Sequence, residues 1–291
     1  MPASSGPAGL AGLLSGVRFA VLTGAGLSTD SGIPDYRGPN AVPRTPVTYQ
    51  EFMRSAEARQ RYWARNQVGW QRMHHAAPNA GHRAVAALER LGVTTGIITQ
   101  NVDRLHEDAG AENVVDLHGR FDRVRCLRCG EVFARAFVAS LLVEANPGFL
   151  DAVAARGGAQ TAPDADAVLD PSLVSSFHVV VCPVCGGLLK PDVVFFGENV
   201  PRHRVSRSFS LVDEAGALLV AGSSLTVMSG LRFVRKAAHD GKPVLIVNRG
   251  HTRGDELATL KLDTGVGEAL AFLAASLEGS RAGWRSGGAV R

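Results

Sequence analysis

A glycine-rich turn follows the first apolar run of this 291-residue chain and offers a place for phosphate chemistry. The run at 19–23 is short and apolar, as expected of a buried parallel strand. After it come Gly24, Ala25 and Gly26, and two residues later Ser28. Glycines at such a strand end let the backbone approach a pyrophosphate, and the amides of the turn can point at its negative charge. The turn therefore predicts a nucleotide site, although an ordinary tight turn of an α/β sheet shares the pattern.

The residues just after the turn favour the nucleotide site. Thr29 stands where the usual dinucleotide fingerprint has its third glycine, and no strand ending in an acidic residue follows about 20 positions later. A plain turn, however, has no use for an apolar, aromatic and cationic cluster. That cluster consists of Ile33, Pro34, Asp35, Tyr36 and Arg37. We expect Arg37 to reach a phosphate and the Ile33-Pro34 pair to wall off a reactive centre.

Two further apolar runs, at 94–99 and 114–117, also end in polar residues. The residues that follow them are Gln100, Asn101, Val102, Asp103, His118 and Gly119. Polar groups at the carboxyl ends of parallel strands line the crevice of an α/β sheet. A lone histidine is more often structural than catalytic, but this one lies at a strand end beside a glycine that allows close approach. We therefore expect His118 to act as a general base.

All four cysteines fall into two Cys-x-x-Cys pairs, each followed by Gly. The pairs are Cys126 with Cys129, and Cys182 with Cys185. Two such pairs predict tetrahedral zinc, and four thiolates leave no open coordination position, so the metal should hold the fold and not do chemistry. The alternative, a redox dithiol, needs only one pair. The interval between the pairs, residues 130–181, is unusually long for a compact zinc site.

The elements that must position these residues alternate as in a doubly wound sheet. Strands are predicted at 19–23, 94–99, 114–117, 217–221 and 243–247, and helices at 82–91, 206–214, 230–239 and 268–277. The last two strands end in small polar residues, as a ribose and adenine site requires. These residues are Gly222, Ser223, Ser224, Asn248, Arg249 and Gly250. We expect an α/β fold: a doubly wound parallel Rossmann-like sheet with a small zinc-binding lobe and a helical module.

The helical module is predicted at 49–74, as one or two helices with different faces. Phe52, Trp63 and Trp70 share a face that we expect to be packed. The opposite face carries Arg54, Arg61, Arg65 and Arg72. Such an arginine face is typical of a solvated surface; the alternative is attraction of an acidic protein or of an anionic group on a substrate.

The segment 190–198 is apolar and extended, with charges on both sides. Its central residues are Val193, Val194, Phe195, Phe196 and Gly197. A core strand is one interpretation. Its proline and its abrupt Gly-Glu end favour an edge or loop with which another extended chain can pair. Before it, residues 132–144 predict a helix, and residues 151–170 predict a loop-rich insertion.

Composition and charge exclude several classes of protein. The formal net charge of +4 depends on three arginines of the Gly/Ser-rich C-terminal tail, so charge implies no specific nucleic-acid partner. No apolar run approaches the roughly 20 residues of a membrane span. Residues 1–17 carry no Lys or Arg, so neither a secretory nor a mitochondrial leader is evident. We expect a cytoplasmic protein without a membrane partner; the sequence leaves its oligomeric state open.

Taken in order, these motifs resemble those of the sirtuins, the NAD-dependent protein-lysine deacylases. The resemblance covers roughly residues 18–275. Its motifs are Gly24-Ala25-Gly26 with Ser28, the run 32–37, Gln100-Asn101-Val102-Asp103, Leu117-His118-Gly119, both cysteine pairs, the run 190–198, Gly222-Ser223-Ser224-Leu225 and Asn248. So many matches in one order leave little room for chance.

The resemblance implies an NAD site across the strand ends and zinc in the small lobe. The pyrophosphate would lie on residues 24–28, the adenosine near Ser223, Asn248 and Val266, and the nicotinamide beside Ile33 and residues 101–103. The cofactor-binding residues implied are Gly24, Ala25, Gly26, Ser28, Ile33, Pro34, Asp35, Tyr36, Arg37, Gln100, Asn101, Val102, Asp103, Gly222, Ser223, Ser224, Asn248, Arg249, Gly250 and Val266.

The resemblance also implies a reaction on acyl-lysine protein substrates. The acyl-lysine would enter as an added strand beside residues 193–197. Its acyl oxygen would attack the ribose carbon as nicotinamide leaves, with His118 as general base on a ribose hydroxyl and with Asn101 and Asp103 as further catalytic residues. The products would be free lysine, nicotinamide and O-acyl-ADP-ribose.

We expect the chain to divide into domains. They are a Rossmann-like NAD-binding domain (18–122 and 187–278, with a helical insertion at about 48–80) and a zinc-binding small domain (123–186), between a flexible N-terminus (1–17) of small residues and a flexible Gly/Ser-rich tail (279–291).

Residues 59–66 and 252–255 look like the class II branch of the sirtuins, which is associated with weak deacetylation, removal of larger acyl groups and ADP-ribosyl transfer. Tyr36, where many sirtuins have Phe, and the long interval between the zinc pairs depart from the better-known deacetylases, so the acyl preference is not carried over. Tyr62 and Arg65 also resemble a Tyr-x-x-Arg pair with which another branch grips acidic acyl groups. The alternative for Arg65 is the solvated arginine face.

Two other functions stay open at this point. A protein ADP-ribosyltransferase would share the NAD site but pass ADP-ribose to a protein side chain. An NAD-responsive binding protein would have negligible turnover, but it has no need of a base beside the nicotinamide ribose. A hydride-transfer dehydrogenase is disfavoured by the missing third glycine and by the zinc pairs.

Overall fold

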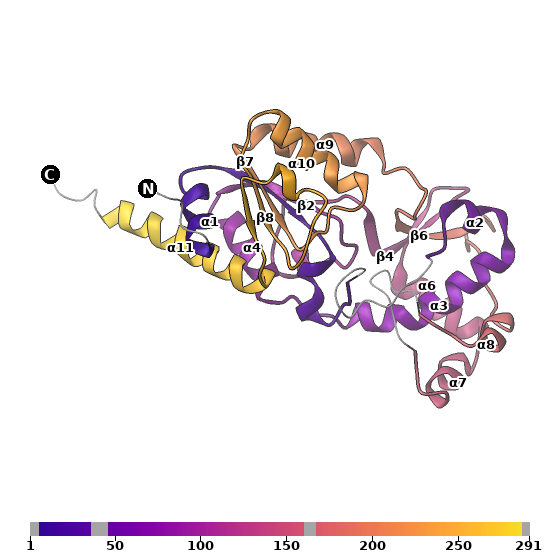
Figure 1. The fold of residues 1–291 in the computed structure, drawn as a ribbon. Helices are drawn as coiled ribbons and strands as arrows, with labels where there is room; N and C mark the ends of the chain where they lie inside the picture. Colours follow the sequence, from indigo (N-terminus) through magenta and orange to yellow (C-terminus); the bar gives the residue numbers. More distant parts are fainter. Residues whose placement is uncertain (1–5, 36–45, 160–166, 287–291) are drawn as a thin grey trace.

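The computed structural model describes residues 6–35, 46–159 and 167–286, with the backbone alone over 281–286. Two sheets lie in the two lobes of an elongated molecule (Figure 1). The larger sheet has the strand order β3-β2-β1-β7-β8-β9, and every neighbouring pair in it is parallel. Its strands are β1 Phe19–Thr23, β2 Thr94–Thr99, β3 Val114–Asp116, β7 Ala217–Ala221, β8 Val244–Val247 and β9 Leu260–Leu262.

Helices cover both faces of this sheet. The helices are α1 Pro7–Leu14, α4 Ala80–Arg90 and α11 Val266–Ser286 on one face, and α9 Arg202–Glu214 and α10 Met228–His239 on the other. Because successive side chains of a strand point to opposite faces, Phe19 and Val21 of β1 join the first core while Ala20 and Leu22 join the second. The doubly wound parallel sheet expected from the sequence is confirmed.

The chain ends differ from the sequence expectation. Residues 7–14 were expected to be flexible, but they form α1, in which Leu10 and Leu14 are buried. These two leucines are one helical turn apart and pack into the core that α4 and α11 share. Helix α11 likewise continues to Ser286, into the segment expected to be a flexible tail.

The smaller sheet is antiparallel, with the order β5-β4-β6. Its strands are β4 Gly119–Cys126, β5 Val132–Ala134 and β6 Leu189–Val193, and the helices around it are α2 Tyr49–Arg54, α3 Ala56–His74, α6 Arg135–Ala145, α7 Phe149–Ala155 and α8 Pro171–Ser175. One apolar core joins these elements and includes Phe52 and Trp63 of the expected aromatic face, while Trp70 is buried on the cavity wall.

Two predictions for this lobe are wrong in part. The segment 132–144 begins as strand β5 and only then becomes helix α6. The insertion expected to be loop-rich begins inside α7, where Phe149 and Val153 are buried one turn apart. Residues 160–166 of the insertion lie outside the described residues.

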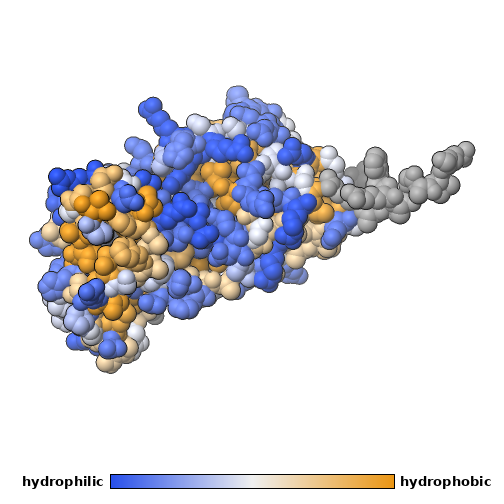
Figure 2. All heavy atoms as spheres, turned by 180° about the vertical axis from the view of Figure 1, so that it is seen from behind, coloured by the Kyte–Doolittle hydropathy of each residue, from blue (hydrophilic) through white to orange (hydrophobic). Residues whose placement is uncertain are grey.

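Apolar side chains gather on the surface of the small-lobe end of the molecule, opposite the C-terminal end (Figure 2). Exposed apolar residues of this lobe include Phe137, Val143, Val181 and Val184. Among the described residues no single helix is both long and apolar enough to cross a membrane; α6 and α7 meet that criterion only as a pair bent by 84°.

Candidate functional site: a cavity at the strand ends

A cavity of about 680 Å³ opens beyond the carboxyl ends of β1, β2, β7 and β8. Between β1 and β7 the direction in which the sheet is built along the chain reverses. From β1 it continues to β2 and β3 on one side, and from β7 to β8 and β9 on the other. Ligands of open α/β sheets bind at such a reversal. The cavity brings together these residues of the predicted cofactor site: Gly24, Ala25, Gly26, Ser28, Ile33, Asp35, Gln100, Asn101, Val102, Asp103, Gly222, Ser223, Ser224, Asn248, Arg249 and Gly250.

The loops after β1 and β7 pack directly on each other on this cavity. The Gly26 amide donates to the Gly222 carbonyl at 2.9 Å. A Cβ atom on Gly24 would lie 2.7 Å from the Gly222 oxygen, and one on Gly222, whose φ is +67°, would lie 2.4 Å from the Leu27 nitrogen. The sequence explained Gly24 and Gly26 by phosphate approach alone, but the packing of the two loops also requires them.

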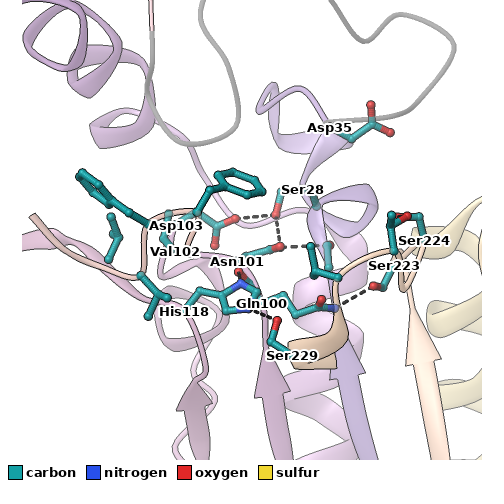
Figure 3. Close-up of a pocket in the computed structure, with 18 of the residues that line it drawn as sticks. Ser28, Asp35, Gln100, Asn101, Val102, Asp103, His118, Ser223, Ser224 and Ser229 are labelled. Atoms are coloured by element: carbon teal, nitrogen blue, oxygen red, sulfur yellow. Dashed lines mark hydrogen bonds between the residues drawn. The ribbon is translucent and has the colours of Figure 1, made fainter. Parts of the chain in front are cut away.

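Ser28 is the centre of a buried hydrogen-bond network between the β1 and β2 loops (Figure 3). Its hydroxyl donates to Asp103 Oδ2 at 2.6 Å and accepts from Asn101 Nδ2 at 3.0 Å. The Asn101 amide also donates to the Gly24 carbonyl at 3.1 Å, and the Leu105 amide donates to Asp103 Oδ1 at 3.0 Å. Burial raises the pKa of Asp103, and the bonds from Ser28 and from the Leu105 amide oppose that rise. The network therefore ties Asn101 and Asp103 to the glycine turn.

His118 presents a neutral imidazole to the cavity. Burial lowers the pKa of His118 to about 4, against the smaller opposing effect of its hydrogen bond to the Gln100 carbonyl. That bond, from Nδ1 at 2.9 Å, fixes the tautomer, because a carbonyl oxygen can only accept. Nε2 is then an acceptor, and the Ser229 hydroxyl lies 2.8 Å from it (Figure 3). His118 Nε2 is therefore unprotonated at neutral pH, and its pKa of about 4 lies below the value near the working pH that was expected for a general base. Ser229 was not found from the sequence.

Strained backbone conformations mark two of the loops around the cavity. Among the described residues, Arg104 with φ of 66° and Leu225 with φ of 55° are the two that adopt positive φ without being glycine. Arg104 follows the β2 loop and Leu225 follows the β7 loop. Such conformations cost about 1–3 kcal/mol each and persist where the surrounding structure enforces them.

The segment 193–197 lines the same cavity and is bound to the backbone of the histidine. The Val194 amide donates to the His118 carbonyl at 2.7 Å. Strand β6, which leads into the segment, lies at an edge of the small sheet, as the sequence indicated. Part of this edge is already paired, because the Tyr49 amide donates to the Phe196 carbonyl at 2.9 Å.

The four cysteine sulfurs lie within 4.8 Å of one another. Sulfur atoms around tetrahedral zinc, with Zn–S bonds of about 2.3 Å, are separated by about 3.8 Å. The Sγ atoms of Cys126 and Cys185 are 3.5 Å apart, and those of Cys129 and Cys182 are 3.8 Å apart. The donor set and its spacing thus fit the expected structural zinc ion.

Comparison with known proteins agrees with this geometry. The model of the Sir2 family matches residues 24–229. The chain belongs to the Sir2 family. It is 58% identical over 268 residues to the NAD-dependent protein deacetylase 1 of Mycobacterium avium, covering 92% of this chain and 94% of that protein. It is 57% identical over 256 residues to the NAD-dependent protein deacetylase 1 of Streptomyces coelicolor, covering 87% and 84%. Among solved structures it is similar to a complex of Sir2 with a p53 peptide and NAD+, with a TM-score of 0.73, 31% identity and coverage of 94% and 98%.

Some residues expected at the site of this sirtuin do not line the cavity. Val266 begins α11 and is buried in the sheet core, and Pro34 is not among the residues that line the cavity. Tyr36 and Arg37 lie outside the described residues. Of the Tyr-x-x-Arg pair, Tyr62 lines the cavity, but Arg65 does not: its Nε donates to the carbonyl of Ala167 in the insertion.

The cavity of this sirtuin also has a wall that the sequence did not predict. Helix α3 contributes Asn66 and Trp70 as well as Tyr62, and Arg135 comes from the start of α6. Trp70 was expected only as a packed aromatic residue. No local motif marks Asn66 or Arg135, since their roles depend on how α3 and α6 pack together.

Proposed function

We infer that this sirtuin is an NAD-dependent protein deacylase. Its relatives over most of the chain carry the name NAD-dependent protein deacetylase. From its own residues, the observation that carries the inference is the neutral His118, which stands in one cavity with both the glycine turn and the segment 193–197. A base between a nucleotide site and a strand edge is what transfer from a peptide to a nucleotide requires.

The cavity fits NAD. Backbone with little or no side chain faces it at Gly24, Ala25 and Gly26, while serine and asparagine side chains line it at Ser223 and Asn248. We propose that the turn binds the pyrophosphate and that the loops after β7 and β8 bind the adenosine. When bound, NAD supplies a ribose carbon that accepts the acyl oxygen as nicotinamide leaves.

We propose that His118 Nε2 accepts a proton from a hydroxyl of that ribose. The Gln100 carbonyl orients the imidazole for this step, and the Gln100 side chain is itself held by the Ser223 hydroxyl at 2.7 Å. The Ser229 hydroxyl is the hydrogen-bond partner of Nε2 in this structure, and the ribose hydroxyl would replace it when NAD binds. A histidine that stays neutral well below pH 7 is available as a base throughout the physiological range.

We propose that Asn101 and Asp103 shape the nicotinamide end of the cavity, with Ile33 and Val102. Their polar groups bond to Ser28, so their first effect is to hold the wall of the site in place. The other predicted cofactor residues that line the cavity keep that role as a proposal.

The substrate that we propose is an acyl-lysine within a protein segment. It would lie along the segment 193–197, which borders the cavity beside His118. A cytoplasmic location is proposed as well, because the zinc-binding cysteines must stay reduced to bind the metal.

A panel of acyl-lysine peptides incubated with the purified protein, with and without NAD, tests the function by mass spectrometry. We expect NAD-dependent loss of the acyl mass from a peptide, matched by an equal amount of O-acyl-ADP-ribose. Deacylation of no peptide by a protein that still binds NAD would contradict the inference. Adenine-labelled NAD in the same reactions would then reveal whether ADP-ribose is transferred to protein.

A further inference from the structure

Arg135 is a buried cation on the wall of the cavity. Its relative exposure is 1%, and its guanidinium lies over the faces of Trp63 and Trp70, 5.4 Å and 5.0 Å from their ring centres. Burial lowers the pKa of Arg135 to about 10, which leaves it charged at neutral pH. A charge that is removed from water costs several kcal/mol unless an opposite charge accompanies it.

No such opposite charge is present in the part of the chain that the structure describes. The partners of Arg135 are neutral: Nη2 donates to Asn66 Oδ1 and to Gln67 Oε1, both at 3.0 Å, and Nε donates to Asn66 Oδ1 at 3.3 Å. Its Nη1 atom has no hydrogen-bond partner among the described residues. Nη1 is itself buried, so its two N–H groups are left without a partner in the wall of the cavity that Arg135 lines.

The position of Arg135 in its helix adds to the positive potential. It is the first residue of α6, an 11-residue helix whose first turn contains no acidic residue. A helix N-terminus disfavours a cation and attracts an anion. The helix end and the guanidinium that its first residue carries thus both favour a negative group.

Aromatic contacts connect this end of the cavity both to the segment 193–197 and to the proposed nicotinamide wall. Tyr62 lines the same wall, and its ring centre lies 4.9 Å from that of Phe195 in the segment 193–197. The ring centres of Trp70 and Phe121 are 5.5 Å apart. The backbone amide of Phe121 in turn donates to the carbonyl of Val102, which belongs to the proposed nicotinamide wall. An acyl group carried by a lysine beside Phe195 and directed at the reacting ribose would therefore pass along the wall that Arg135 belongs to.

We propose that Arg135 makes this deacylase selective for acyl groups that end in a carboxylate, such as dicarboxylic acyl chains on lysine. The carboxylate would accept hydrogen bonds from Nη1 and supply the missing opposite charge. The proposal rests on the proposed deacylase function, and it assigns the acidic acyl group to Arg135 and not to Arg65, the arginine of the Tyr-x-x-Arg pair.

The test compares two lysine acyl groups of nearly equal shape on one peptide: glutaryl, which ends in a carboxylate, and its neutral carboxamide analogue. An acetyl-lysine peptide of the same sequence reports whether the enzyme is active at all. We expect kcat/KM for the glutaryl peptide to exceed that for the carboxamide peptide by about 30-fold or more. The reason is that the carboxamide has no negative charge to pair with the buried guanidinium. Quenching of tryptophan fluorescence without NAD should show the same preference in binding, since Trp63 and Trp70 border the guanidinium.

Three variants locate the preference. Arg135→Met should reduce it to within about threefold, and the matched control Arg65→Met should retain it. Asn66→Asp serves as a second route if Arg135→Met does not fold, because it places a carboxylate where Asn66 Oδ1 already accepts from Arg135. That internal carboxylate should neutralise the guanidinium and abolish the preference.

Equal turnover of the glutaryl and carboxamide peptides by the wild type, with the acetyl peptide still deacylated, would overturn the Arg135 proposal and leave the deacylase function standing. Retention of the preference in Arg135→Met, or in Asn66→Asp, would overturn it too. Deacylation of none of the three peptides would instead refute the proposed function.

Discussion

Replacing Ser28 with Ala should loosen the loops on which the cofactor site is built. The hydroxyl is almost completely buried and joins the β1 loop to the β2 loop through Asn101 and Asp103. The substitution removes no apolar contact and introduces no bulk, so its main effect is the loss of the hydrogen bonds with Asp103, with Asn101 and, at 3.4 Å, with His82 Nε2. Asn101 Nδ2 keeps its bond to the Gly24 carbonyl, but Asp103 Oδ2 loses the short bond from Ser28.

The magnitude follows from these partners. A buried polar group left without its partner costs about 1–3 kcal/mol, and more when the group is charged, so the free energy of unfolding should fall by about 2–4 kcal/mol. With an unfolding entropy near 2.1 cal/mol/K per residue, a chain of 291 residues loses about 3–7 °C in Tm. The bond from Ser28 also lowers the pKa of Asp103, so its removal should raise that pKa further.

Differential scanning calorimetry and steady-state kinetics measure both consequences. We expect the Tm loss to be accompanied by a fall in kcat/KM of about 10- to 100-fold, because small displacements of positioned groups are costly in catalysis. Ser210→Ala is the control, since its hydroxyl is exposed and donates to the Ser206 carbonyl of its own helix α9. A Ser28→Ala protein with the Tm and the activity of the control would refute the claim that this network holds the site.

Three further predictions concern the histidines and the zinc site. His118→Ala should abolish deacylation while NAD binding, measured by calorimetry, stays within about threefold; normal turnover would exclude His118 as the base. Cys126→Ser should lower the zinc content and the stability of the small lobe, and an unchanged metal content would remove Cys126 from the ligand set. Burial lowers the pKa of His82 to about 4 and that of His106 to about 3. Below about pH 6.5 these two histidines should therefore take up protons in the unfolded chain but not in the folded protein. Each should then reduce the free energy of unfolding by up to about 1.4 kcal/mol per pH unit of acidification. Below about pH 6 the loss should become shallower, because burial raises the pKa of Asp116 to about 6 and the folded state then binds a proton there; urea midpoints that stay constant from pH 7 to pH 5 would contradict the assignment.

The site residues that could be predicted from the sequence are those that directly follow a buried strand. Each buried strand is a short apolar run that the sequence marks clearly, so Gly24, Asn101, His118 and Ser223 could be assigned to one crevice without knowing the strand order. The cysteine pairs were equally readable, because their spacing reflects the geometry of one metal ion.

The rest of the site depends on contacts between elements that are distant in sequence. Ser229 meets His118 from the start of α10, a helix that packs on β7 and β8, and Arg135 meets Asn66 only because α6 lies against α3. The spacing of Tyr62 and Arg65 allowed both to face one ligand, yet Arg65 is drawn away by the Ala167 carbonyl. Helical spacing restricts which side chains can share a face, but it does not say which partner each of them finds.

Strand β4 links the zinc site to His118, the proposed base. It begins at Gly119, directly after His118, and ends at Cys126, so an ion bound at one end of the strand restrains the backbone at the other. Gly119 has φ of +88°, and a Cβ atom there would lie 2.0 Å from the Asp192 carbonyl, so β6 can approach the histidine only because this residue is glycine. The bond from the Val194 amide to the His118 carbonyl then joins the segment 193–197 to the same strand. Zinc that performs no chemistry is therefore still expected to affect kcat, because both the proposed base and the proposed substrate edge are attached to the sheet that it holds together.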